Sequence, residues 1–209
     1  MKLLLIGATG LVGSHVLHQA LDDPRITEVI APTRRTLPNH PKLFAPLIDF
    51  EQLPTDAVWW QVDAVICALG TTMKKAQSKE AFRRVDHDYP LAVARLARRQ
   101  GTPTYVLNSA LGADVGSRFF YSRVKGEVEQ GLVASDFASL TLVRPGLISG
   151  NRPEFRLGER VAESVLTVLG PVLPKRWRVN PAERIATTLL NAAIQAQPGT
   201  HIISSAALI

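Results

Sequence analysis

The stretch LLLIGATGLVG, residues 3–13, decides the fold of this chain. Its apolar residues predict a buried strand, and the three glycines Gly7, Gly10 and Gly13 predict a tight turn into a helix. In such a turn the first glycine permits the bend, the second lets the backbone approach a pyrophosphate, and the third lets the helix pack close to the strand. A helix that begins near residues 9–11 directs free N–H groups at those phosphates. We therefore expect this turn to bind a dinucleotide, and the alternative is a turn without a ligand.

Apolar strands and helices alternate along the rest of the chain. Strands are expected at residues 2–6, 26–32, 42–49, 63–69, 104–109, 139–144 and 201–204, and helices at 11–21, 78–100, 118–134, 159–169 and 182–196. This alternation predicts an α/β fold, a Rossmann-type doubly wound parallel sheet with helices on both faces. We expect a single domain over residues 1–209, in which residues 147–180 form a small substrate-pocket or cap segment.

The composition narrows the class of protein. The chain has 209 residues, 46% of them hydrophobic and 20% charged, a balance that argues against disorder. No apolar run is long enough for an integral membrane segment, and the apolar part of the N-terminus is too short for a signal peptide. The single cysteine, Cys67, is expected in the core and favours a reducing, cytoplasmic location.

The net charge of +6 is dispersed and would help attract an anionic ligand. No aromatic and basic signature accompanies it, so nucleic acid is not expected as a partner. The five histidines show no ligand spacing, so no metal is expected. Peripheral membrane association through residues 161–173, flanked by Lys175, Arg176 and Arg178, is an alternative to a buried helix with solvated arginines.

Two arginines predict which dinucleotide binds. Arg34 and Arg35 follow the second expected strand, about 20 residues past the glycines, where an acidic residue would bind the ribose hydroxyls of NAD. A guanidinium instead offers a fork of donors suited to a 2′-phosphate. The cofactor is therefore expected to be NADP(H) in preference to NAD(H), and the alternative is a pair of solvated arginines.

Further cofactor contacts are expected where other strands end. Asp49 and Phe50 lie where the adenine should rest, although Asp49 is equally well explained as a loop cap. Small residues at 68–70 would let the cofactor ribose pass close to the backbone. The expected cofactor-binding residues are Gly7, Thr9, Gly10, Leu11, Val12, Gly13, Arg34, Arg35, Asp49, Phe50, Ala68, Leu69, Gly70, Lys125, Pro145, Gly146, Leu147 and Ile148.

A tyrosine and a lysine four residues apart are candidates for acid–base chemistry. Tyr121 and Lys125 share one face of the expected helix, and a nearby ammonium lowers the pKa of a phenol. Tyr121 could then donate a proton to a carbonyl or accept one from an alcohol. Ser109, at the end of the fifth expected strand, could hold the carbonyl oxygen. The alternatives are surface residues of a helix and a hydroxyl that bonds to backbone.

The glycine turn, Ser109 and Tyr121-x-x-x-Lys125, in that order, resemble the short-chain dehydrogenase/reductase superfamily, and the glycine spacing resembles its extended and atypical branches. The segments VDHDYP (85–90), NSALGADVGSRFFYSRVKGEVE (108–129) and VRPGLISGNR (143–152) are similar to the Tat-interacting-protein type of NADPH-binding oxidoreductase-like proteins. The resemblance implies that the serine, tyrosine and lysine face the nicotinamide, and that the lysine also binds the nicotinamide ribose. It further implies that the turn at 145–148 passes beside the nicotinamide amide.

Asp86 departs from the superfamily pattern, because many members carry an asparagine there that supports a proton relay. The expected function is reduction of a small carbonyl compound by NADPH, with Tyr121 as proton donor and a pocket wall from residues 147–178, including Phe155, Leu166 and Trp177. The alternative is a catalytically weak regulatory or scaffold protein that senses NADPH and binds a protein partner. A nucleotide-sugar epimerase or dehydratase is less favoured, because little chain follows Pro145. A homodimer is also compatible with the sequence.

Overall fold

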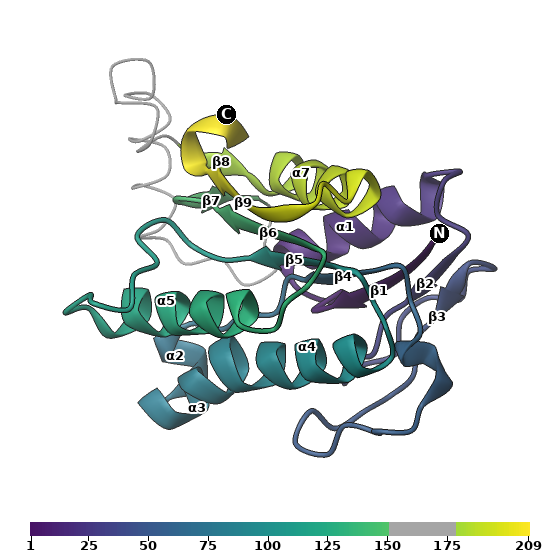
Figure 1. Cartoon of the computed structure of the whole chain (residues 1–209), viewed down its shortest axis with the longest axis horizontal. Helices are drawn as coiled ribbons and strands as arrows, with labels where there is room; N and C mark the ends of the chain where they lie inside the picture. The colour runs from purple at the N-terminus through teal and green to yellow at the C-terminus, as the bar shows by residue number, and fades with distance from the viewer. Residues whose placement is uncertain (151–178) are drawn as a thin grey trace.

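The computed structural model describes residues 1–150 and 179–209 (Figure 1). Its strands are β1 (Lys2–Ile6), β2 (Glu28–Ile30), β3 (Leu43–Phe44), β4 (Ala64–Cys67), β5 (Thr104–Asn108), β6 (Ser139–Arg144), β7 (Ile148–Ser149), β8 (Asn180–Pro181) and β9 (Gly199–Ser204). Its α-helices are α1 (Leu11–Asp22), α2 (Met73–Ala76), α3 (Lys79–Arg83), α4 (Tyr89–Arg99), α5 (Phe120–Val133) and α7 (Ala182–Gln195). Short helical turns cover Val58–Trp60, Arg84–Asp88 and Ser205–Leu208.

The main sheet has seven strands in the order β3-β2-β1-β4-β5-β6-β9, and every pair in it is parallel. The chain adds β2 and β3 on one side of β1, and β4, β5, β6 and β9 on the other. The order therefore reverses between β1 and β4, where Leu3 pairs with Ala64 and Ile6 with Cys67. Ligands of such sheets bind beyond the carboxyl ends of the strands at this reversal. The predicted Rossmann-type α/β fold is confirmed.

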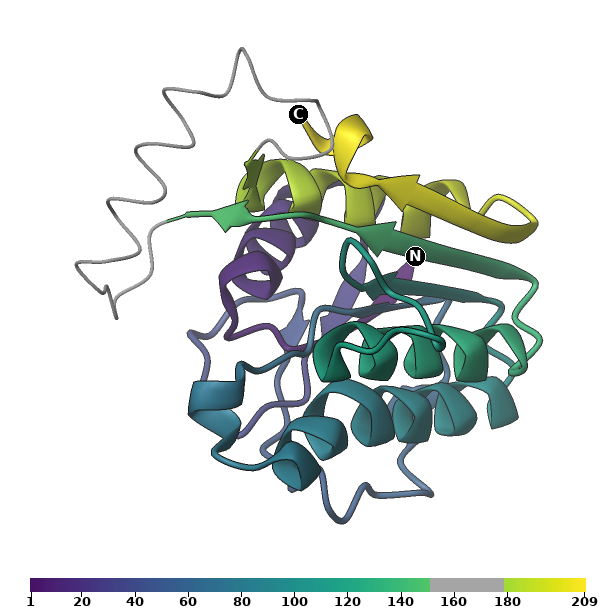
Figure 2. The same cartoon turned by 90° about the vertical axis from the view of Figure 1, so that its left-hand side faces the viewer.

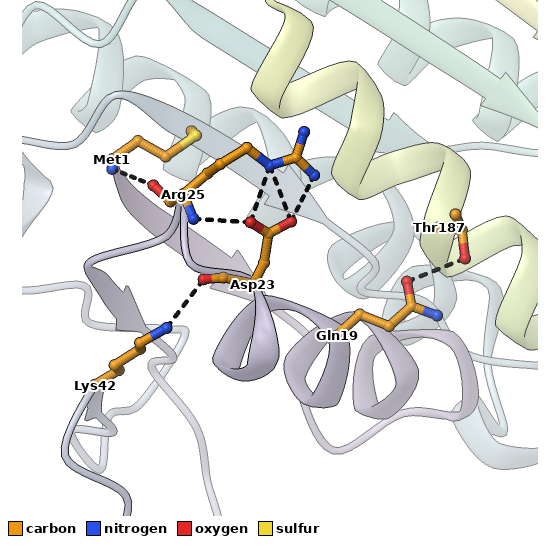
Figure 3. A network of polar contacts seen from close by, with 6 residues as sticks. All are labelled: Met1, Gln19, Asp23, Arg25, Lys42 and Thr187. Carbon is orange, nitrogen blue, oxygen red and sulfur yellow. Dashed lines mark hydrogen bonds and ion pairs between the residues drawn. The ribbon is translucent and has the colours of Figure 1, made fainter.

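Helices cover both faces of the sheet, as Figures 1 and 2 show. One core joins α1 and α7 to residues such as Leu5 and Ile66, and the other joins α4 and α5 to Leu4 and Val65 on the opposite face. The strands are apolar on both faces because both faces are buried. Helices α1 and α7 lie side by side, and the Thr187 hydroxyl of α7 donates to Gln19 Oε1 of α1 at 3.1 Å (Figure 3).

At the amino end of the sheet, polar contacts fix the loop between α1 and β2 (Figure 3). Asp23 accepts from Arg25 through both carboxylate oxygens. The Met1 ammonium donates to the Arg25 carbonyl at 2.6 Å, and the Lys42 ammonium donates to the Asp23 carbonyl at 2.9 Å. The hydrogen bond from Arg25 lowers the pKa of Asp23 to about 2. These contacts lie at the end of the strands away from the expected ligand.

The helix expected over residues 78–100 is divided. A π-helical turn at Arg84–Asp88 separates α3 from α4, and the Tyr89 N–H donates to the Arg84 carbonyl within it. Pro90, in the first turn of α4, has no N–H to continue the regular pattern back to residue 86. The wider turn places Asp86 in the buried interior, where it is 2% exposed.

Other boundaries also differ from those expected. Strand β3 is limited to Leu43–Phe44, with a separate bridge between Thr33 and Leu47, because Pro46 interrupts the segment. Helix α2 and the pair β7 and β8 were not expected. The expected helix at 159–169, the pocket residues Phe155, Leu166 and Trp177, the basic cluster at 175–178 and most of the cap segment lie outside the described residues.

Candidate functional site

The glycine turn brings β1, β4 and α1 into close contact. Gly7 has a φ of +89°, and a Cβ there would lie 2.8 Å from the backbone of Ala68 and Leu69. A Cβ on Gly13 would lie 2.1 Å from the Gly7 carbonyl oxygen, so only glycine lets α1 pack this close. Helix α1 begins after Gly10 with no side-chain cap and no acidic residue in its first turn. This uncapped terminus at the switch point fits the phosphates of a dinucleotide.

The chain after β6 returns to the same edge of the sheet. A Cβ on Gly150 would lie 2.8 Å from Leu11, and Ile148 packs against the core that contains α1. The Gly146 N–H donates to Asn180 Oδ1 at 2.7 Å, and the Leu147 carbonyl accepts from the Asn180 N–H at 2.8 Å. The predicted turn at 145–148 therefore lies near the start of α1, held there by a buried asparagine.

Asn180 was not singled out in the sequence. It is fully buried, and its Oδ1 also accepts from the Ser205 hydroxyl at 2.7 Å while its Nδ2 donates to the Ser205 carbonyl at 3.0 Å. One side chain thus joins the turn after β6 to the C-terminal segment. The sequence offered no signal beyond an asparagine beside a proline, which is also typical of an ordinary turn.

The two arginines predicted to bind a 2′-phosphate, Arg34 and Arg35, are exposed and follow β2. The Arg35 N–H donates to the Thr33 hydroxyl at 3.2 Å, which fixes the backbone there. Within residues 1–150 and 179–209, neither guanidinium forms a salt bridge.

The expected adenine contacts have other partners. Asp49 Oδ1 accepts from the Glu51 N–H at 2.9 Å, as a loop-capping aspartate does. Phe50 is 8% exposed and packs against Tyr89 with 5.5 Å between ring centroids. The loop-cap explanation for Asp49 therefore fits the structure, and a role in adenine binding stays a prediction for both residues.

Lys125 and Asp86 form a buried ion pair beside Tyr121. The Lys125 ammonium lies 2.8 Å from Asp86 Oδ1, and Asp86 Oδ2 accepts from the Thr71 N–H at 2.8 Å. Lys125 is 4% exposed, whereas Tyr121, one helical turn earlier on α5, is 43% exposed. The Asp86 carboxylate joins the lysine directly to the loop that leaves β4.

The charges around the tyrosine work against each other. Burial raises the pKa of Tyr121, the Lys125 ammonium lowers it, and the Asp86 carboxylate raises it, so that the pKa lies above its usual value. Burial lowers the pKa of Lys125, but Asp86 and Tyr121 outweigh it and raise that pKa overall. The spacing of Tyr121 and Lys125 suggested a lowered tyrosine pKa, but burial outweighs the effect of the lysine, and Asp86 adds to the rise.

Ser109 has an unexpected partner. Its hydroxyl donates to Glu129 Oε1 at 2.5 Å, and Glu129 also accepts from Arg144, through Nε at 3.0 Å and through Nη2. Ser109 and Glu129 are 5% and 4% exposed. The hydrogen bond that Arg144 donates to Glu129 raises the pKa of the Arg144 guanidinium, which stays charged. The serine hydroxyl is therefore bound by a buried carboxylate and is not free.

Glu129 was missed in the sequence, although a signal was present. It follows Tyr121 and Lys125 at the same four-residue step, so all three lie along one stripe of α5. What the spacing could not supply is the contact with Ser109 and Arg144, which comes from the packing of α5 on β5 and β6.

The parallel sheet, its reversal beside β1 and the glycine turn define a Rossmann-type protein that binds a dinucleotide. The model of the NAD dependent epimerase/dehydratase family matches residues 3–118, more than half of the sequence, and the chain belongs to this family. This membership supports a nicotinamide cofactor.

Three similar proteins, all named Protein FMP52, mitochondrial, come from fungi. The protein of Emericella nidulans is 38% identical over 208 residues, which cover 93% of this chain and 88% of that protein. The protein of Eremothecium gossypii is 34% identical, over 83% of this chain and 77% of that protein. The protein of Candida albicans is 32% identical, over 79% of this chain and 75% of that protein. These relatives contradict the expected cytoplasmic location, because they are named mitochondrial. They support the short-chain dehydrogenase/reductase superfamily broadly, and the Tat-interacting-protein type stays a prediction.

Solved structures with the same fold include MoeE5 in complex with UDP-glucose and NAD. It is 15% identical, with a TM-score of 0.74 over 97% of this chain and 75% of that one. The PhqB reductase domain from Penicillium fellutanum is 20% identical, with a TM-score of 0.70 over 97% and 66% of the two chains. At these identities the likeness shows the fold alone.

None of the helices in residues 1–150 and 179–209 is long and apolar enough to cross a membrane. Within the same residues, no group of three or more His, Cys, Asp or Glu side chains could hold a metal ion. Cys67 is fully buried in the core, as expected.

Proposed function

We propose that this protein is an NADPH-dependent reductase of a small carbonyl compound. The bound cofactor would supply a hydride to the carbonyl carbon. Tyr121 would donate its phenolic proton to the carbonyl oxygen, which yields an alcohol, and the tyrosinate would regain a proton from solvent. Lys125 would bind the nicotinamide ribose and stabilise the tyrosinate while it exists.

The observation that carries this proposal is the buried pair of Lys125 and Asp86 beneath a half-exposed tyrosine. With the pKa of Tyr121 above its usual value, the side chain is a protonated phenol at neutral pH. A phenol is the form that can donate a proton to a carbonyl, as the proposed reduction requires. The exposed arginines after β2 support NADPH as the reductant.

The test is oxidation of NADPH in the presence of a panel of aldehydes, ketones and quinones. We expect turnover by the wild type and a loss of at least about a hundredfold in Tyr121→Phe, the usual contribution of a general acid. Tyr89→Phe is the matched control and should retain activity. Tight NADPH binding without turnover of any compound would overturn the reductase and favour the regulatory protein.

A nucleotide-sugar epimerase is a second candidate, because the chain belongs to the NAD dependent epimerase/dehydratase family. Epimerisation needs no net cofactor, so it would escape an assay of NADPH oxidation. Incubation with UDP-glucose and UDP-glucuronic acid, followed by separation of the sugars, distinguishes the two functions. Formation of an epimer would replace our proposal with the second candidate.

A further inference from the structure

Ser109 has only one hydrogen to donate, and that hydrogen is already used. The hydroxyl donates to Glu129 Oε1, and both residues are buried from solvent. A serine oxygen that donates its hydrogen elsewhere keeps only lone pairs for a ligand. Toward any further partner, Ser109 is therefore a hydrogen-bond acceptor.

The contacts of Glu129 hold the serine hydroxyl in this orientation. Arg144 donates to Oε1 and Oε2 of Glu129, and the Ser109 hydroxyl is the second donor to Oε1. If the Ser109 hydroxyl turned toward a ligand, Glu129 Oε1 would keep only one donor, the Arg144 Nε–H at 3.0 Å. A buried carboxylate that loses a donor is destabilised, which holds the serine in its present orientation.

We propose that Glu129 is a positioning residue that makes Ser109 an acceptor, and that the substrate is a carbonyl compound that also carries a hydroxyl group. This inference rests on the proposed reductase function. Tyr121 supplies the donor that the carbonyl oxygen needs, and Ser109 accepts from the hydroxyl. A substrate with an ether oxygen in place of that hydroxyl would form no hydrogen bond with Ser109, because both oxygens would be acceptors.

Hydroxyacetone and methoxyacetone test this inference, because they differ in the hydrogen that Ser109 would accept. We expect the wild type to favour hydroxyacetone by about tenfold in kcat/KM, the effect of one hydrogen bond. In Glu129→Gln the amide oxygen would face Arg144 and the amide nitrogen would donate to Ser109, which frees the serine hydrogen for the ligand. The preference should then shift toward methoxyacetone.

Glu127→Gln is the matched control, because Glu127 lies two residues away on α5 and pairs with Arg83 instead. It should leave the preference unchanged. Ser109→Ala is the second variant, in case Glu129→Gln does not fold, and it should reduce the ratio of the two kcat/KM values to that of their intrinsic reactivities. An unchanged preference in both Ser109→Ala and Glu129→Gln would overturn the inference.

A readout without turnover separates this inference from the proposed function. In proton NMR spectra, we expect a downfield hydroxyl resonance that is present in the wild type and Tyr121→Phe and absent from Ser109→Ala and Glu129→Gln. If no carbonyl compound oxidises NADPH, the reductase fails, and this resonance still tests the orientation of Ser109. Its absence from the wild type would overturn that orientation.

Discussion

Single atoms decide the geometry of the glycine turn. A methyl group at position 13 would lie 2.1 Å from the carbonyl oxygen of Gly7, where neither backbone can give way easily. We expect Gly13→Ala to lower the free energy of unfolding by about 3 kcal/mol, the upper end of the usual cost of overpacking. Urea unfolding measures this.

Gly116→Ala is the control for that substitution, because a Cβ there makes only ordinary contact, 3.5 Å from Asp114. It should change the free energy of unfolding by less than about 1 kcal/mol. Equal effects of the two substitutions would contradict the close approach of α1 to β1.

The Asp86 carboxylate adds to the rise that burial causes in the pKa of Tyr121. Burial raises the pKa of Tyr105 well above its usual value, and burial together with a hydrogen bond to Glu51 raises that of Tyr89 to about 12. We therefore expect the first tyrosine ionisation in an alkaline ultraviolet titration to be that of Tyr121, and Tyr121→Phe to remove it. Asp86→Asn should lower this first pKa, because the substitution removes a negative charge that raises it.

Glu51→Gln is the matched control, since it changes the surroundings of Tyr89 and leaves those of Tyr121 intact. Its first ionisation should stay where it is in the wild type. A first pKa that does not move in Asp86→Asn would mean that Asp86 does not act on the tyrosine.

The arginines after β2 make the cofactor preference measurable. We expect the double variant Arg34→Ala/Arg35→Ala to weaken NADPH binding by about ten- to a hundredfold, the effect of losing a charge-assisted hydrogen bond to phosphate. NADH, which lacks that phosphate, should bind the variant as it binds the wild type. Arg99→Ala, on the last turn of α4, is a control. Equal wild-type affinities for the two cofactors would contradict the preference for NADPH.

At the residue scale, the sequence predicted the positions that local chemistry dictates. The close packing at Gly13 follows from the glycine spacing, and the shared helix face of Tyr121 and Lys125 follows from their separation. The partners of Ser109 could not be predicted in this way. Glu129 and Arg144 lie on other elements, and only the packing of those elements determines which carboxylate the serine meets.

At the scale of elements, the strands were predicted better than the helix before β5. Strands β1, β4 and β5 each contain a continuous apolar run, which is visible in the sequence. The π-helical turn at Arg84–Asp88 interrupts the expected helix, and it depends on which carbonyl accepts each backbone N–H. In the sequence, Pro90 indicated only that the helix would be irregular. That wider turn is what places Asp86 against Lys125.

The turn after β6 depends on one side chain of another element. Asn180 makes hydrogen bonds to Gly146 and Ser205 from a fully buried position. Asn180→Ala would leave these backbone and hydroxyl groups unpaired, and we expect a loss of about 2–3 kcal/mol in the free energy of unfolding, measured by urea denaturation. Asn191→Ala, at an exposed position of α7, should have almost no effect. A loss of less than about 0.5 kcal/mol in Asn180→Ala would contradict this role.

For the whole molecule, the ion pair of Asp23 and Arg25 at the amino end of the sheet makes the stability of the fold depend on pH. The pKa of Asp23 is lowered from 3.8 to about 2 in the folded state, so its pairing with Arg25 stabilises the fold above pH 3.8 and the effect is lost as the pH falls toward 2. Asp23→Asn should lower the melting temperature at neutral pH, and the two melting curves should converge near pH 2. The effect is small, about 1 kcal/mol or less, because the pair lies at the surface.

Asp22→Asn, at the exposed neighbouring position, is the control and should change the melting temperature little at any of these pH values. A constant difference between Asp23→Asn and the wild type across the acid range would show that the carboxylate stabilises the loop through its shape and not through its charge.

The pairing of β6 with β9 also bears on how the chain is made. Ser139 of β6 pairs with Gly199 of β9, so this side of β6 stays unpaired until β9 is added. While the ribosome is still producing the intervening segment, β6 exposes a free row of backbone donors and acceptors next to apolar side chains. Such an edge is a template for aggregation. Nascent chains that stop before residue 199 would therefore depend on chaperones more than the finished protein does.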